Sequence, residues 1–333
     1  MKSLKVLIIL LIITLTASAQ TLPQMRREDK VRIKEAMIIS KQFGDKIWKG
    51  INEVPFTIIL VTDSVEFLIN HPYPSDDFKL LSEDTLLITK IYFRKAQFSK
   101  HLLATFPAVN GVNCIVVGIP ENTEKNSTDW IITLLHEHFH QYEYNSPGYY
   151  HAVEQLDLSG GDQTGMWMLN YPFPYDSSVV IDQFNKYTSA LSTALSAINT
   201  NEFQNSFNNY KIERNKFKHL LKPVDYRYFS FQVWQEGIAR YTEYKFLEMM
   251  DNYQPSAEVK QLADFIPFNI YKDTFYHSQL SKLTELKLKE DKRVCFYAIG
   301  FAEGLLLDHL EPDWRSKFLT ERFNIENYSD GFK

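Results

Sequence analysis

Residues 134–140, which read LLHEHFH, constrain the fold more than any other part of the chain. His136 and His140 are four residues apart, so on a helix their imidazoles stand on one face and can reach one metal ion. Glu137 lies about 100° around the helix from His136, where its carboxylate can contact a metal-bound water without being a ligand. The spacing therefore predicts a helix that carries a zinc site, with Glu137 as general base. His138 points to the opposite side and is predicted to pack or cap. With nine histidines in the chain, a chance occurrence of the pattern is the alternative.

A third ligand is expected from residues 233–244, which read VWQEGIARYTEY. Glu236 would complete a site of two histidines and one glutamate and leave the fourth position of zinc to water or substrate. The small Gly237 and Ala239 would let this helix approach the His136 helix closely. Glu243 returns to the face of Glu236 and is predicted to accept the second N–H of a ligand histidine. The alternative is an amphipathic helix with solvent-facing carboxylates.

These blocks resemble the gluzincins, whose pattern is HExxH with a distal Glu, and they are similar in particular to the aminopeptidase N family. That family reads HExxHQWxxN, NEGFAxYxE and YxKG, and this chain reads HEHFHQYEYN at 136–145, EGIARYTE at 236–243 and YAIG at 297–300. The resemblance implies one Zn²⁺ per chain and a peptide or protein substrate. It also implies that Tyr297 hydrogen-bonds the oxyanion of the intermediate, and that Asn145 supports the ligands together with Glu243.

A weaker similarity concerns the residues that would bind the amino-terminal end of a substrate. Residues 118–122 read GIPEN and are similar to the family's GxMEN, in which the Glu binds the free amino terminus of the substrate. Glu121 and Gly118 are therefore candidate substrate-binding residues. The alternative is a strand that runs into a polar loop, and the sequence leaves aminopeptidase and endopeptidase action both open.

The pattern of apolar residues predicts an α+β fold. Mixed apolar and charged spacing over 25–51 is typical of an amphipathic helix, and runs rich in Ile, Val, Thr and Phe are typical of strands. These runs cover 55–62, 85–93 and 113–119. Residues 121–129 are polar and turn-like, and Ser127 or Thr128 can cap a helix that begins near Trp130.

Helical spacing dominates the rest of the chain, so a small N-terminal β-sheet should be followed by a mostly helical half. The resemblance implies a zincin-like catalytic domain. We predict a single domain over 20–333, with an α/β part at 20–125 and a mainly helical part at 126–333. A large helical insertion, about 146–225, would separate the zinc-binding helices, because 95 residues lie between His140 and Glu236. Its aromatic residues could cover the cleft or form an extra packed layer.

The first nineteen residues have the pattern of a secretory signal. Lys2 and Lys5 precede an apolar run over 6–15, and residues 17–19 read ASA, which predicts cleavage before Gln20. The alternative is an uncleaved anchor. No second stretch is long enough to span a bilayer, so we predict an exported protein, periplasmic or extracellular. The formal charge of -5 and the absence of a long basic tract argue against a nucleic-acid partner.

Two cysteines, Cys114 and Cys295, could form one disulfide or remain two buried thiols. The leading functional hypothesis is a secreted zinc metallopeptidase, a hydrolase of peptide bonds. A non-catalytic binding protein on the same fold is one alternative, although the presence of Glu137 argues against it. A zinc hydrolase of a non-peptide amide or ester is another, since the same activated water attacks these bonds.

Overall fold

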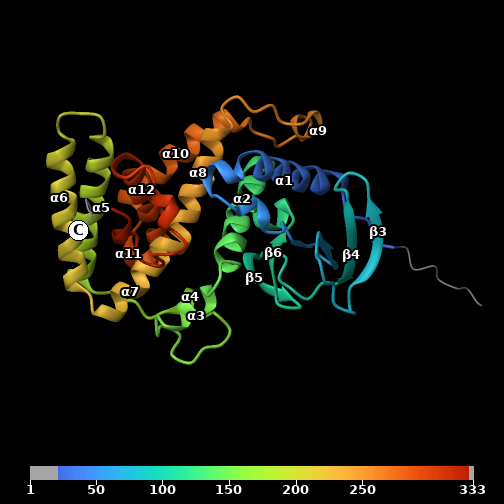
Figure 1. Ribbon diagram of the computed structural model, residues 1–333, viewed down its shortest axis with the longest axis horizontal. Helices are drawn as coiled ribbons and strands as arrows, with labels where there is room; N and C mark the ends of the chain where they lie inside the picture. Colours follow the sequence, from blue (N-terminus) through green and yellow to red (C-terminus); the bar gives the residue numbers. More distant parts are fainter. Residues whose placement is uncertain (1–21, 330–333) are drawn as a thin grey trace, which may run out of the picture.

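The computed structural model describes residues 22–329, so the predicted signal peptide at 1–19 lies outside the described part. The fold is α+β, as predicted. The chain begins with helix α1 (Arg27–Ile47), forms a six-stranded sheet, and then continues as helices. Figure 1 shows the sheet at one end of an elongated molecule and the later helices at the other.

The sheet is mixed. Its order is β3-β4-β2-β1-β6-β5; β1 and β6 are parallel and all other neighbours are antiparallel. The strands are β1 (Ile58–Val61), β2 (Val65–Ile69), β3 (Lys79–Asp84), β4 (Thr89–Lys95), β5 (Leu103–Val109) and β6 (Val112–Gly118). The three predicted runs correspond to β1, β4 and β6. Three strands were missed. The edge strands β3 and β5 have no clear apolar alternation, because β3 is mostly exposed and β5 contains Pro107. The inner strand β2 was also missed, although four of its five residues are buried.

The two faces of the sheet are covered differently. All four residues of β1 are buried, and they alternate between the faces. Ile58 and Leu60 belong to the main core, which contains α1 and α2 (Ser127–Tyr144), whereas Ile59 and Val61 belong to a smaller cluster on the other face. The zinc-motif helix α2 is therefore held against a rigid sheet, in contact with β5 and β6.

Helix α2 begins at Ser127, but its N-cap is Asn126, which corrects the predicted cap at Ser127 or Thr128. The Asn126 side chain accepts a hydrogen bond from the backbone N–H of Asp129 at 2.9 Å. Both predicted caps serve another purpose. Ser127 donates its hydroxyl to Asp264, and Thr128 donates to the carbonyl of Ile266 at 2.6 Å. These contacts fix the start of α2 to the segment that precedes α10.

The segment between α2 and η3 (Val233–Gly237) is largely helical, as expected for the predicted insertion. It contains α3 (Tyr149–Glu154), α4 (Trp167–Asn170), α5 (Ser178–Ser196), α6 (Phe203–Leu220) and the start of α7 (Pro223–Gln232). Helices α5 and α6 pack against each other at the end of the molecule far from the sheet (Figure 1). The aromatic residues before α5 pack inward, since Phe173 contacts Phe296 of α12 with ring centroids 5.3 Å apart.

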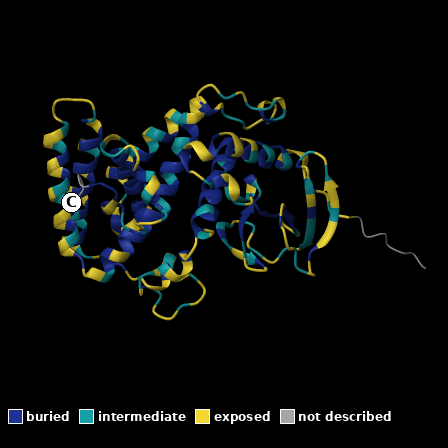
Figure 2. Ribbon diagram, viewed as in Figure 1, coloured by how far each residue is buried: buried dark blue, intermediate teal, exposed yellow. Residues whose placement is uncertain are grey.

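Helix α12 (Val294–Leu310) lies at the centre of the helical half and is buried along most of its length (Figure 2). It packs against η3, α8 and α10. The remaining elements are η1 (Ile51–Glu53), η2 (Pro120–Thr123), η3 (Val233–Gly237), α8 (Ile238–Met249), α9 (Ala257–Lys260), α10 (Phe268–Glu285), α11 (Leu288–Asp291), η4 (Trp314–Lys317) and η5 (Ile325–Tyr328). Cys114 and Cys295 are both free and buried, so of the two alternatives the structure shows the thiols. None of the described helices is long and apolar enough to cross a membrane.

Candidate metal centre

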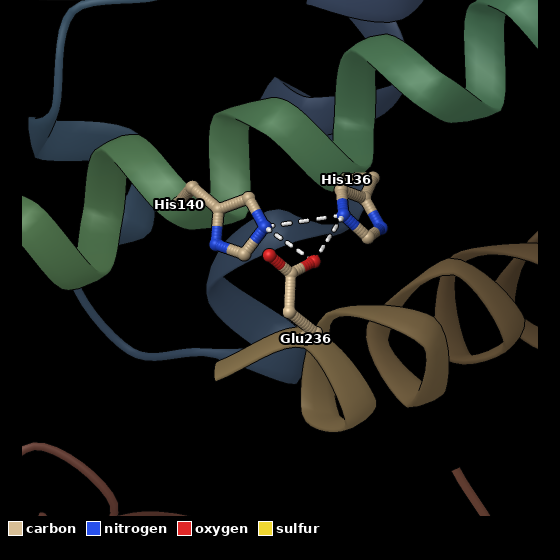
Figure 3. A group of neighbouring side chains, drawn as sticks. All are labelled: His136, His140 and Glu236. Carbon is tan, nitrogen blue, oxygen red and sulfur yellow. Dashed lines mark hydrogen bonds and ion pairs between the residues drawn. The ribbon is translucent and has the colours of Figure 1, made fainter. Parts of the chain in front are cut away.

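The structure brings together the three residues that the sequence proposes as ligands. His136 and His140 project from α2 and Glu236 projects from η3, with their side chains pointing toward one another (Figure 3). The two Nε2 atoms are 3.1 Å apart, and Glu236 Oε2 lies 3.8 Å from His136 Nε2 and 3.7 Å from His140 Nε2. A tetrahedral zinc ion with bonds of about 2.05 Å places its ligand atoms about 3.4 Å apart. The three separations scatter around that value, so the residues fit the ion.

Glu236 reaches this position because two backbones touch. Its element, η3, is a single π-helical turn immediately before α8, and such turns are often found at functional sites. A Cβ on Gly237 would lie only 2.5 Å from the Cα of Gly300 in α12. The sequence prediction that Gly237 allows a close approach to the His136 helix is therefore corrected, because its close neighbour is α12. Two glycines in contact let η3 lie directly against α12.

The outer nitrogen of each ligand histidine faces a buried carboxylate. His136 Nδ1 lies 2.5 Å from Glu243 Oε1, and His140 Nδ1 lies 2.7 Å from Glu143 Oε2. A carboxylate accepts hydrogen bonds, so each imidazole carries a proton on Nδ1. In the neutral form, which is the one that binds a metal, each ring then directs its Nε2 lone pair at the common point. Glu243 was proposed for this position from the sequence, whereas Glu143 was missed.

Charges around the two imidazoles favour a cation. Burial opposes a charge on His140, but the Glu143 and Glu236 carboxylates outweigh it and raise its pKa well above the usual value. Burial raises the pKa of Glu143 to about 7, although His140 lowers it. Burial also acts against the charge on Glu236, but its hydrogen bonds to His136 and His140 hold its pKa well below the usual range. The two imidazoles and the Glu236 carboxylate thus form a two-histidine, one-glutamate donor set that suits zinc, and the buried Glu143 and Glu243 add negative charge behind it.

Glu137 lies beside the ligands but is fixed by the sheet. The hydroxyl of Thr105, in edge strand β5, is 2.8 Å from Glu137 Oε2 and 2.9 Å from the Glu137 carbonyl oxygen. Both residues are buried. The carboxylate therefore has a defined orientation that does not depend on a metal. Thr105 was missed because β5 itself was not predicted.

Tyr297 lies next to Glu236 and between two guanidinium groups. Arg293 donates a hydrogen bond to the Tyr297 hydroxyl at 2.6 Å and approaches Glu236 Oε1 to 4.0 Å. Arg293 and Arg240 each lie 5.6 Å from the centre of the Tyr297 ring. Burial and the Glu236 charge raise the pKa of Tyr297, so the phenol stays protonated. Because Arg293 supplies a donor to the phenol oxygen, the phenol's own O–H is directed to an acceptor, and Glu236 provides one in the structure.

Other sequence candidates lie away from the ligands. Asn145 follows α2 and donates to the carbonyl of Gln141 at 2.7 Å, with no described hydrogen bond to a ligand. Both oxygens of Glu121 accept hydrogen bonds from Arg26, each at 2.8 Å. Gly118 is required for packing, because a Cβ there would lie 1.8 Å from the carbonyl oxygen of Lys100. None of these three therefore has a described contact with the ligand group.

His138 packs on the opposite side of α2. Its ring stacks on Phe56 with centroids 4.3 Å apart, and its Nδ1 lies 2.8 Å from Gln141 Oε1. Gln141 in turn donates to the carbonyls of Thr57 and Asn113, which anchors α2 to the sheet. Burial lowers the pKa of His138 to about 4, so this histidine is neutral at pH 7.

Comparison with protein-family models, with curated proteins and with solved structures found no match.

Proposed function

We propose that this protein is a zinc-dependent peptidase whose metal is held by His136, His140 and Glu236. The observation that carries the proposal is the orientation of the imidazoles. Both bind a buried carboxylate through Nδ1 and direct Nε2 at one point that Glu236 also faces. Such carboxylate–histidine pairs fix the tautomer of metal ligands and raise their basicity.

The surrounding residues fit the hydrolysis of an amide bond. A zinc ion bound here would polarise the scissile carbonyl and lower the pKa of a bound water. Glu137, held by Thr105, would accept a proton from the attacking water and return it to the leaving amine. Tyr297 would donate a hydrogen bond to the carbonyl oxygen as that oxygen gains negative charge. Arg293 orients the phenol for this role.

The sheet supports a peptide as the substrate. Strand β5 contacts α2 and is the last strand of the described sheet, so one of its edges faces no other described strand. An extended peptide can add to such an edge through main-chain hydrogen bonds. The Arg26–Glu121 pair weighs against recognition of a free amino terminus by Glu121, because both carboxylate oxygens are already engaged. Residues 1–19 support a place of action outside the cytoplasm.

Hydrolysis of a mixed peptide library by the zinc-loaded protein tests this function. Glu137→Gln should retain zinc and lower turnover by about 100-fold or more, because the general base is lost while the ligands stay. Glu154→Gln, at an exposed position in α3, is the matched control and should leave turnover unchanged. Equal turnover in Glu137→Gln and wild type would contradict the role of Glu137. A zinc-loaded wild type that cleaves no peptide would contradict the proposed function.

A further inference from the structure

A pocket of about 190 Å³ lies between α8, α10 and α12 and shares Tyr297 with the metal centre. Its volume is below the roughly 300–1,000 Å³ of sites for drug-sized ligands, so it suits a group no larger than an amino-acid side chain. None of its lining residues is acidic. They are Arg240, Gln279, Lys282, Val294, Tyr297 and Ala298.

The amide of Gln279 is the first sign of a ligand. Gln279 is only 3% exposed and lines the pocket, yet its side chain makes no hydrogen bond to any residue within 22–329. Buried amides are almost always hydrogen-bonded. An amide that makes no described hydrogen bond and lines a pocket is therefore suited to bind a polar group that enters there.

Two cations surround this amide. Lys282 is half-buried and has no carboxylate within 4.0 Å in the described chain. Arg240 uses Nη1 to bind both oxygens of Glu243 at 3.0 Å, and its other N–H groups make no described hydrogen bond. Burial and the neighbouring Arg240 lower the pKa of Lys282, although the more distant Glu243 and Asp129 carboxylates act in the opposite direction. The apolar Val294 and Ala298 complete the lining.

The pocket is coupled to the metal centre by two residues. Arg240 binds Glu243, whose carboxylate binds His136, and Tyr297 contributes to both places. A group held in the pocket would therefore lie beside Tyr297, the residue proposed to contact a carbonyl held at the metal.

We propose that this pocket binds a carboxylate of the substrate, with Lys282, Arg240 and Gln279 as the recognising groups. The inference rests on the proposed function and adds a substrate class to it, namely peptides with an acidic group near the scissile bond. The carboxylate comes either from an acidic side chain or from the C-terminus of the peptide. Two cations with an amide donor can satisfy both oxygens of either source.

Binding of three small probes distinguishes the two sources without requiring hydrolysis. N-acetyl-glutamate α-amide carries only the side-chain carboxylate, N-acetyl-glutamine only the terminal one, and N-acetyl-glutaminamide neither. Calorimetric titration of the zinc-loaded protein should show at least one acidic probe binding about 10-fold or more tightly than the neutral one, the gain expected of a charge-assisted contact. The acidic probe that binds identifies the source.

Pocket variants locate the binding. Lys282→Gln should abolish the preference for the acidic probe, and Gln279→Glu should do the same by placing a negative charge in the pocket. Lys289→Gln on α11 removes an equal charge from an exposed position and should retain the preference. Equal affinity for all three probes, or an unchanged preference in Lys282→Gln, would overturn the proposal. These outcomes leave the peptidase assay unaffected, so a failure of the pocket and a failure of the peptidase function can be told apart.

Discussion

Two buried polar clusters contact the same helix, α12, and differ in how their charges are balanced. One is the proposed metal centre of His136, His140 and Glu236, adjacent to Tyr297. The other surrounds Glu303, whose Oε1 accepts hydrogen bonds from the Tyr187 hydroxyl at 2.6 Å, the Tyr210 hydroxyl at 2.5 Å and Arg214 Nε at 2.8 Å. Arg214 continues to Glu326, so this network connects α5, α6 and α12 to the C-terminal segment.

The two clusters differ in whether hydrogen-bond donors face their carboxylates. In the Glu303 network, every carboxylate meets an arginine, a lysine or a phenol, although Glu303 Oε2 itself has no hydrogen-bond partner among the described residues. In the metal centre, the histidine N–H groups point outward to Glu143 and Glu243, while two Nε2 lone pairs and the Glu236 carboxylate face one another. Buried carboxylates alone therefore do not indicate a ligand site. A site is indicated where several acceptor atoms, here two imidazole nitrogens and a carboxylate, face one point without donors between them.

The largest expected effect on stability comes from breaking the Glu303 network. Arg214→Met leaves the buried Glu303 carboxylate without its cation, and removing one partner of a buried pair typically costs about 3–5 kcal/mol. Chemical denaturation measures the free energy of unfolding. Arg227→Met, an exposed arginine on α7, is the control and should cost less than about 1 kcal/mol. Zinc content should stay at the wild-type level in both variants.

Replacing both partners of that network sharpens the comparison. The double variant Arg214→Met/Glu303→Met should be more stable than Arg214→Met alone, because it leaves no unpaired charge at this position. If Arg214→Met lost zinc while remaining folded, the two clusters would not be independent, and the distinction drawn between them would be wrong.

His138 gives the next effect, which depends on pH. Its folded-state pKa of about 4 lies below its ordinary value of 6.5, so the unfolded chain binds a proton at a pH where the folded chain does not. Stability from this group is present above pH 6.5 and is lost as the pH falls to 4, by up to about 3 kcal/mol. The unfolding free energy of His138→Asn should show a correspondingly smaller loss over this window. An identical pH profile in wild type and variant would contradict the low pKa.

The contact between Gly237 and Gly300 tests how the metal centre depends on backbone position. Gly300→Ala places a Cβ about where the Gly237 backbone lies, 2.4 Å from its Cα, and overpacking of this kind costs about 1–3 kcal/mol. Because η3 must then move away from α12, zinc affinity should fall, and Gly237→Ala should act in the same way. Competition with a chromogenic chelator measures the affinity; unchanged zinc binding in both variants would show that the contact does not position Glu236.

Local patterns in the sequence predicted one part of the site and could not predict the other. The positions of His136, His140, Glu236 and Glu243 follow from spacing on single helices, which depends only on helical geometry. Thr105 could not be found in the same way, because its contact with Glu137 depends on an edge strand that has no clear apolar alternation.

Packing between distant elements explains the remaining differences. A spacing of four residues on one helix is enough to predict that Arg293 lies near Tyr297. The proximity of Arg293 to Glu236 depends instead on how α12 crosses η3. Ser127 was predicted to cap α2, but Asn126 is the N-cap. Ser127 instead donates its hydroxyl to Asp264, 137 residues later in the chain. Asn126 and Ser127 are both small polar residues that favour an N-cap, so the sequence alone does not distinguish them. Their contacts in the folded chain decide which one caps the helix.

Metal content measured by elemental analysis tests the central claim most directly. Purified wild-type protein, dialysed against metal-free buffer, should retain about one zinc per chain. His140→Ala and Glu236→Gln should each lose most of it while remaining folded, and Glu137→Gln should keep it. Full zinc retention in both ligand variants, or a folded wild type that binds no zinc when zinc is supplied, would contradict the assignment of His136, His140 and Glu236 as a metal centre.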